Sequence, residues 1–126
     1  MRLPRKPTVV VICLAVAGLH LLTGPGYHGP FRAFVTGYLI DLVLPFALVL
    51  LLGVGAERLP ALAPPLVRGL LVFLIGAAVE LLQYLGVPLF GRTADPLDLV
   101  MYASGATLGL LFERLVLGPV APDQTT

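Results

Sequence analysis

Residues 33–56 read AFVTGYLIDLVLPFALVLLLGVGA, and this stretch decides the class of the fold. A helix must supply about 20 mostly apolar residues to cross the hydrocarbon core of a bilayer. The stretch is long enough, and Asp41 is its only charged residue. Pro45 removes one backbone donor and is expected to kink the helix. We therefore expect a transmembrane helix over residues 33–56.

Three further apolar segments flank this one, and segments rich in proline and glycine separate them. They cover residues 8–23, 66–87 and 97–117. Proline and glycine break helix continuity, so the segments between are expected to be loops. The pattern predicts an all-α, polytopic membrane protein, with residues 1–126 forming one membrane domain built as a four-transmembrane-helix bundle.

The first segment also fits a cleaved signal peptide, because basic residues precede its apolar run. Its one A-x-A pattern, at residues 15–17, lies inside the apolar run rather than after it. We therefore favour a retained helix.

Composition supports the membrane assignment. Hydrophobic residues make up 58% of the 126 residues, charged residues only 12%, and the mean hydropathy is +0.99. A soluble domain carries about 25% charged residues. The net charge of +1 argues against a nucleic-acid-binding protein, which needs basic side chains to neutralise phosphates. Cys13 is the only cysteine, so neither an internal disulfide nor a thiolate metal site is expected, and no cofactor or metal is predicted.

Basic residues set the expected orientation. The side of the membrane that would hold both chain ends has six of them, and the opposite side has two. Short loops rich in lysine and arginine stay in the cytoplasm. We expect a multi-pass protein of the cell membrane with both termini cytoplasmic. The six are Arg2, Arg5, Lys6, Arg58, Arg68 and Arg114, and the two are Arg32 and Arg92.

Small residues predict close helix contacts. Gly105 and Gly109 are four residues apart, a spacing that lets another helix backbone approach closely. The neighbour could belong to the same chain or to a partner in a homo- or hetero-oligomer. A Gly105→Leu change should loosen the bundle more than it alters any chemistry.

Acidic residues inside the apolar segments carry the functional information. Asp41 and Glu80 each lie roughly 10–12 Å from the outer end of their helix, at about 1.5 Å per residue. A carboxylate near the bilayer centre costs roughly 2.5–3.5 kcal/mol on insertion scales. Gln83 lies three residues after Glu80, on the same stripe of the helix. Such residues indicate either a ligand or proton site or a polar network that holds helices together.

The fourth segment adds a polar stripe of its own. Asp98 and Tyr102 are four residues apart and share one face. Asp95 and Pro96 before them are typical of a helix start, which makes Asp95 a capping residue. Arg92 is the natural counter-ion for Glu80 or Asp98. The candidate ligand-binding residues are therefore Asp41, Glu80, Gln83, Arg92, Asp98 and Tyr102.

The acids outnumber the bases at this outer cluster by four to two, with Asp95 and Arg32 included. A partly buried site does not hold such an excess comfortably. We expect Asp41 or Glu80 to be protonated at neutral pH, or a cationic group to occupy the site. By contrast, the inner half is expected to be plain apolar helix with basic flanks, with Glu113 at the membrane interface.

The residues around the third and fourth segments resemble the VanZ-like superfamily of small bacterial membrane proteins. That family has E-x-x-Q near the end of one helix, an Arg in the loop, an Asp opening the next helix, and a Gly seven residues later. Glu80, Gln83, Arg92, Asp98 and Gly105 follow this order. Where the family has an Asn four residues after the Asp, this chain has Tyr102, which is closer to a sister branch defined only as a domain of unknown function.

The resemblance implies a place in the bacterial inner membrane and a link to resistance against teicoplanin, a lipoglycopeptide. It brings no established reaction, and the Tyr102 departure weakens the antibiotic link.

Three functions fit the residues. The first is binding or modulating a lipid-like or amphipathic molecule, with membrane lipids or a glycopeptide as the partner. The second is a structural or partner subunit whose polar network locks the helices. The third is an intramembrane enzyme that uses Glu80 and Asp98 as an acid–base pair. No Ser-His pair, H-E-x-x-H motif or phosphate loop is present in the sequence, so we lean against an enzyme.

Overall fold

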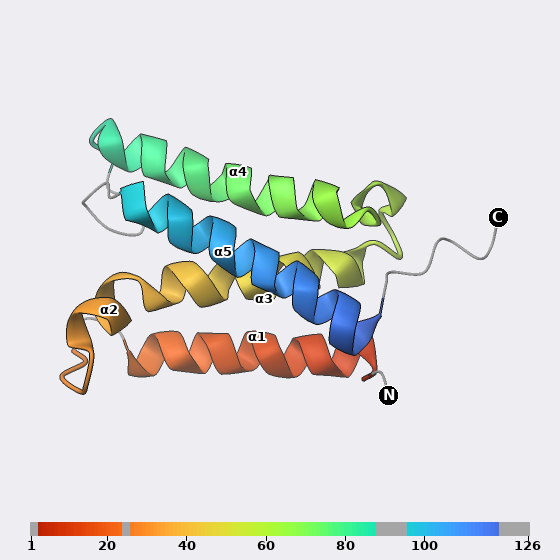
Figure 1. Cartoon of the computed structure of the whole chain (residues 1–126), viewed down its shortest axis with the longest axis horizontal. Helices are drawn as coiled ribbons and strands as arrows, with labels where there is room; N and C mark the ends of the chain where they lie inside the picture. Colours follow the sequence, from red (N-terminus) through yellow and green to blue (C-terminus); the bar gives the residue numbers. More distant parts are fainter. Residues whose placement is uncertain (1–2, 24–25, 88–95, 119–126) are drawn as a thin grey trace.

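The fold is a layered set of long helices, here described from a computed structural model that covers residues 3–23, 26–87 and 96–118 (Figure 1). All regular structure in these residues is helical. The long helices are α1 (Arg5–Leu22), α3 (Leu39–Gly55), α4 (Pro65–Tyr84) and α5 (Pro96–Phe112). The short ones are α2 (Arg32–Gly37), the 3-10 helix η1 (Pro60–Leu62) and the π-helix η2 (Glu113–Leu117).

Three helical stretches are long and apolar enough to cross a membrane: Arg5–Leu22, Pro65–Tyr84 and Pro96–Leu117, the last being α5 continued by η2. This agrees with the prediction of an all-helical membrane protein. The stretch predicted as one helix over 33–56 is divided into α2 and α3 at Tyr38. The remaining apolar helix, α3, has 17 residues and spans about 26 Å at ~1.5 Å per residue.

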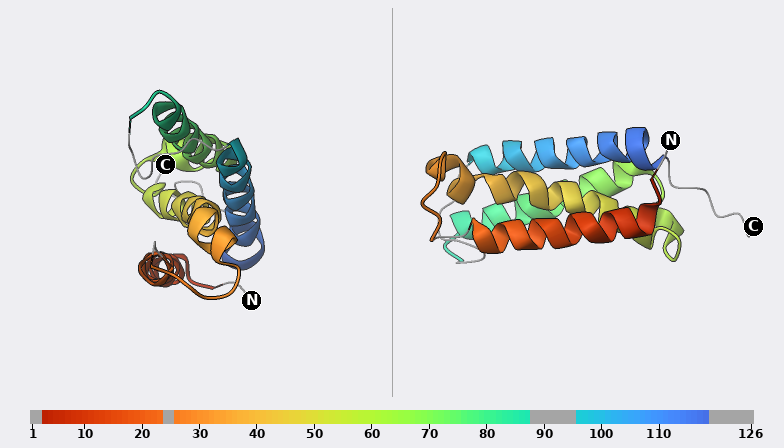
Figure 2. Two further views of the ribbon diagram at one scale, coloured as in Figure 1. Left: turned by 90° about the vertical axis from the view of Figure 1, so that its left-hand side faces the viewer. Right: turned by 90° about the horizontal axis from the view of Figure 1, so that it is seen from below.

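Helix α3 occupies the middle of the structure. It packs against α1, α4 and α5, and α1 and α4 lie on opposite sides of it (Figure 2). Its sequence explains this place, because Asp41 is the only charged residue of α3 and a helix that is otherwise apolar all round belongs in the interior. Pro45, Val49, Leu50 and Gly53 of α3 are all buried.

The contact between α3 and α5 depends on two glycines. A Cβ atom added at Gly105 would lie 2.7 Å from Cγ of Pro45 and would also overlap the carbonyl group of Leu42. One added at Gly109 would lie 2.8 Å from the carbonyl oxygen of Phe46. The two backbones therefore touch directly, which is the close approach that the glycine spacing predicts. Both glycines are buried against α3 of the same chain.

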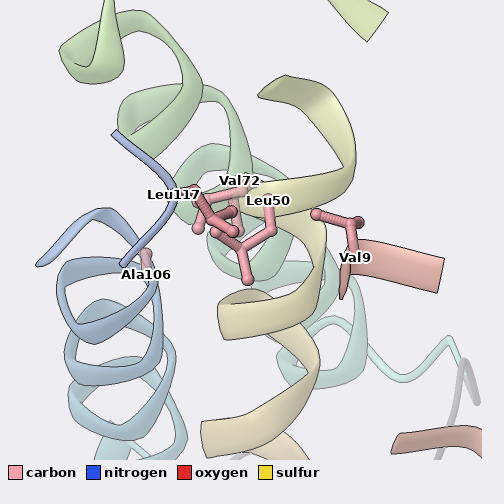
Figure 3. Packing of buried hydrophobic residues seen from close by; sticks show 6 residues of the cluster. Val9, Leu50, Val72, Ala106 and Leu117 are labelled. Carbon is pink, nitrogen blue, oxygen red and sulfur yellow. The ribbon is translucent and has the colours of Figure 1, made fainter. Parts of the chain in front are cut away.

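A compact apolar core lies toward the end of the bundle where η2 meets the start of α1 (Figure 3). It joins Val9 of α1, Leu50 of α3, Val72 of α4 and Leu117 of η2, together with Val49 and Ala106. Each long helix thus contributes at least one buried side chain. The packing of these side chains holds the long helices against one another at this end of the bundle.

A buried ion cluster lies at the same end. Glu113 is 3% exposed and Arg68 is 1% exposed. Arg68 Nη2 donates to Glu113 Oε1 at 2.6 Å and also to Oε2, while Arg5 Nη1 donates to Oε1 at 3.0 Å. We call Arg5, Arg68 and Glu113 the arginine clasp.

The arginine clasp connects segments that are far apart in the sequence. Arg68 Nη1 donates to the carbonyl oxygens of Leu62 and Ala63, both at 2.7 Å. Arg5 Nη2 donates to the carbonyl oxygen of Gly118 at 2.6 Å. The segment between α3 and α4 and both ends of the described chain are therefore fixed by one carboxylate and two guanidinium groups.

Gly53 of α3 makes room for the clasp. A Cβ atom there would lie 3.0 Å from Arg5 Nη1 and 3.6 Å from both Arg68 Nε and Glu113 Oε1. The expectation that this half is plain apolar helix is wrong, because it contains a buried cluster of charged side chains. Arg68 is not an exposed flanking charge either. The physical reason is that Arg68 and Glu113 neutralise each other, which makes their joint burial tolerable. The place of Glu113 relative to the membrane interface stays a prediction.

Replacing Gly105 with alanine is expected to lower the free energy of unfolding by about 1–3 kcal/mol, because the added methyl group forces α5 away from α3. The matched control is Gly18→Ala in α1, where an added Cβ meets nothing within 4 Å. That change should be neutral or should stabilise the helix by up to about 1 kcal/mol. Unfolding in mixed micelles measures both, and equal effects would contradict the glycine contact.

Replacing Glu113 with glutamine is expected to destabilise the protein by about 3–5 kcal/mol, since it leaves the buried Arg68 and the partly buried Arg5 without their counter-charge. Glu57→Gln is the matched control. Glu57 pairs with Lys6 at 3.0 Å, but both side chains are 62% exposed. Its loss should cost less than about 1 kcal/mol. Thermal unfolding of the two variants side by side tests this, and a Glu113→Gln loss no larger than the control would refute the clasp.

Candidate functional site

A cavity of about 520 Å³ lies at the opposite end of the bundle from the arginine clasp, between α3, α4 and α5. Its volume falls within the roughly 300–1,000 Å³ of small-molecule sites. We call it the acid cavity. It is lined by Thr36, Ile40, Asp41, Leu44, Leu48, Ile75, Gly76, Val79, Glu80, Gln83, Asp98, Leu99 and Tyr102.

Each of the three helices contributes a carboxylate to the acid cavity: Asp41 from α3, Glu80 from α4 and Asp98 from α5. Gln83 adds an amide one turn after Glu80. All four side chains are half-buried, so water screens them less than surface groups. None of the described residues that line the cavity is basic. The lining therefore favours cations and hydrogen-bond donors.

Tyr102 closes the acid cavity on the side of the apolar core. A Cβ atom at Gly76 would lie 2.6 Å from Cε1 of Tyr102, so the ring lies directly against the backbone of α4. The ring also packs on the buried apolar cluster. Gly76 is thus a space-making residue, and Tyr102 is a wall of the cavity as well as a packing residue.

Five of the six candidate residues from the sequence line this one cavity: Asp41, Glu80, Gln83, Asp98 and Tyr102. The sixth, Arg92, and the proposed capping residue Asp95 lie outside the described residues. The other outer arginine, Arg32, is the first residue of α2 and is exposed.

A second cavity, also of about 520 Å³, lies between α1 and α3, and we call it the apolar cavity. It is lined by Cys13, Val16, Ala17, His20, Ile40, Asp41, Leu44, Ala47, Leu48 and Leu51. Apart from the thiol of Cys13, the polar side chains in this lining are those of His20 and Asp41. This cavity was not predicted from the sequence.

The apolar cavity and the arginine clasp were not predictable from the sequence, for different reasons. The cavity is lined mainly by ordinary apolar residues, which carry no signal of their own. The clasp has a signal in the sequence, because Glu113, Arg5 and Arg68 lie in or next to apolar segments, at the end of the bundle predicted to be cytoplasmic. Their pairing is between residues up to 108 positions apart, and only the packing of the helices brings them together.

Metal binding finds no support in the geometry. Within the described residues, no three histidine, cysteine, aspartate or glutamate side chains are arranged to hold a metal ion. The three acids of the cavity come from separate helices and surround a space of ligand size instead.

Comparison with known proteins returned no matching protein-family model, no matching curated protein and no matching solved structure.

Proposed function

We propose that this protein is a four-span protein of the bacterial cell membrane that binds an amphipathic molecule through the acid cavity. The polar head of the ligand enters the cavity, and its apolar part stays among the helices. The observation that carries the proposal is the set of three carboxylates around one space of about 520 Å³ with no basic residue among its described lining.

Charge identifies the kind of head group. Three acids facing one cavity repel one another unless a proton or a cation is present. An ammonium group or a head rich in hydroxyls donates hydrogen bonds to carboxylates, and charged hydrogen bonds contribute about 1.5–3 kcal/mol each. The acid cavity therefore suits an amine or polyhydroxyl head. Arg32 is exposed on α2 and does not line the cavity, and Arg92 lies outside the described residues.

The count of four spans rests on α3. This helix is too short to qualify by length alone, but it is packed among three helices that do. Helix α2 precedes it directly, and the two together cover Arg32–Gly55. With four spans, both termini share one side, and the excess of basic residues assigns that side to the cytoplasm. The acid cavity then opens in the outer half of the bilayer.

The resemblance to the VanZ-like superfamily belongs to the same proposal. Glu80, Gln83 and Asp98, which carry that resemblance, line the acid cavity together. A glycopeptide bearing an amine and an acyl chain is one molecule of the proposed chemical class.

A structural role is the second candidate. Asp41, Glu80, Gln83 and Asp98 each take part in an interaction within the structure. A polar network of this kind could hold α3, α4 and α5 together without any ligand. An acid–base enzyme that uses Glu80 and Asp98 is the third candidate, and no further catalytic group among the described lining residues supports it.

Ligand binding is tested with hexadecylamine, whose ammonium group is charged at neutral pH. Native mass spectrometry of protein released from phosphatidylcholine nanodiscs counts the bound amine. Asp41→Asn and Glu80→Gln should each weaken binding roughly tenfold to a hundredfold, the equivalent of one charged hydrogen bond. Glu57→Gln, an exposed acid far from the cavity in sequence and structure, should bind like the wild type.

The outcome separates the candidates. Equal binding by all four proteins would contradict the proposed site. Large losses of thermal stability in Asp41→Asn and Glu80→Gln, with amine binding unaffected, would support the structural role. Release of a modified lipid that stops in Glu80→Gln would favour an enzyme.

Topology is tested by fusing green fluorescent protein or alkaline phosphatase to the C-terminus in a bacterial host. A cytoplasmic C-terminus gives fluorescence and no phosphatase activity. The opposite pattern would contradict the proposed orientation.

A further inference from the structure

The acid cavity and the apolar cavity share part of their walls. Ile40, Asp41, Leu44 and Leu48 of α3 line both of them. These residues occupy one strip of α3, since they are spaced by one, three and four positions along a helix. Leu44, within this strip, is 37% exposed. The strip therefore forms a common wall at which the two cavities meet.

The helices around this strip explain the arrangement. Helix α1 lies on one side of α3 and α4 lies on the other (Figure 2). The apolar cavity extends from the strip toward α1, and the acid cavity extends from it toward α4 and α5. The two cavities therefore adjoin along this strip, which is the arrangement that a molecule longer than either cavity would need in order to reach both past Asp41.

The chemistry of the two linings is different. The apolar cavity is formed by aliphatic and small side chains along two turns of α1, including Val16 and Ala17, with Leu51 from α3. The acid cavity has carboxylates from three helices. One cavity suits a hydrocarbon chain, and the other suits a cationic head.

We propose that the two cavities form one binding site for a single-chain amphiphile with a cationic head, such as a long-chain amine. This rests on the proposed function and adds where the chain lies. The ammonium group pairs with Asp41, Glu80 and Asp98, and the alkyl chain lies between α1 and α3 beside Cys13. Because lipid tails are as apolar as these side chains, the head supplies the affinity and the apolar cavity sets the position of the chain.

Cys13 reports whether the chain is in place, because it lines the apolar cavity and is the only cysteine. Wild-type protein in phosphatidylcholine nanodiscs is labelled with the membrane-permeant N-cyclohexylmaleimide. Saturating hexadecylamine should slow the labelling of Cys13 at least fivefold. Hexadecanol and palmitate, which have the same chain without a cationic head, should leave the rate unchanged.

A second variant tests the chain position without using Cys13. Ala17→Phe places a ring in the apolar cavity and should weaken hexadecylamine binding at least tenfold in native mass spectrometry. Leu21→Phe is the matched control on the same helix, because Leu21 is 83% exposed and lines neither cavity. It should bind the amine like the wild type.

The experiments distinguish an error in the position of the alkyl chain from an error in the proposed binding of the amine. If the amine binds in a manner that depends on Asp41 and Glu80, but neither Cys13 protection nor the Ala17→Phe effect occurs, the chain lies elsewhere and only this inference is overturned. If the amine does not bind the wild type at all, both are overturned.

Discussion

The carboxylate of Glu113 is the group on which the arrangement of the helices most depends. It is buried with two arginines, one from α1 and one from α4, and it belongs to the helical turn that continues α5. Neither charge type is stable in the interior without the other. The packing of α1, of α4 and of η2 at this end therefore depends on one another. Gly53 of α3 leaves the space in which Arg5, Arg68 and Glu113 meet.

The charged side chains are arranged differently at the two ends of the bundle. At the clasp, one acid pairs with two arginines, and the buried apolar core lies next to them. At the other end, three acids surround an open space together with an amide and a phenol. An enclosed cluster in which an acid and two arginines contact one another directly stabilises a fold, whereas several carboxylates that face a cavity of ligand size are the arrangement expected of a binding site. The glycine contact between α3 and α5 connects the two regions and keeps their spacing fixed.

The sequence predicted the helical membrane class and the apolar segments, because length and hydropathy act locally. Helical spacing also grouped Glu80 with Gln83 and Asp98 with Tyr102, and these pairs do share a cavity with Asp41. The break between α2 and α3 was not foreseen, since Tyr38 has no strong turn preference. The pairing of Glu113 with Arg5 and Arg68 could not be derived either. It depends on which helices become neighbours, and hydropathy contains no information about that choice.

The central claim is that an ammonium head group lies among the carboxylates of the acid cavity. Solid-state NMR tests it directly through dipolar couplings between ¹⁵N-labelled hexadecylamine and ¹³C-labelled aspartate and glutamate side chains in lipid bilayers. The account predicts couplings from the amine nitrogen to Asp41 and Glu80 carboxyl carbons at separations of about 4–6 Å, the range of a direct charge interaction. Couplings only to lipid head groups, with none to these two residues, would contradict it.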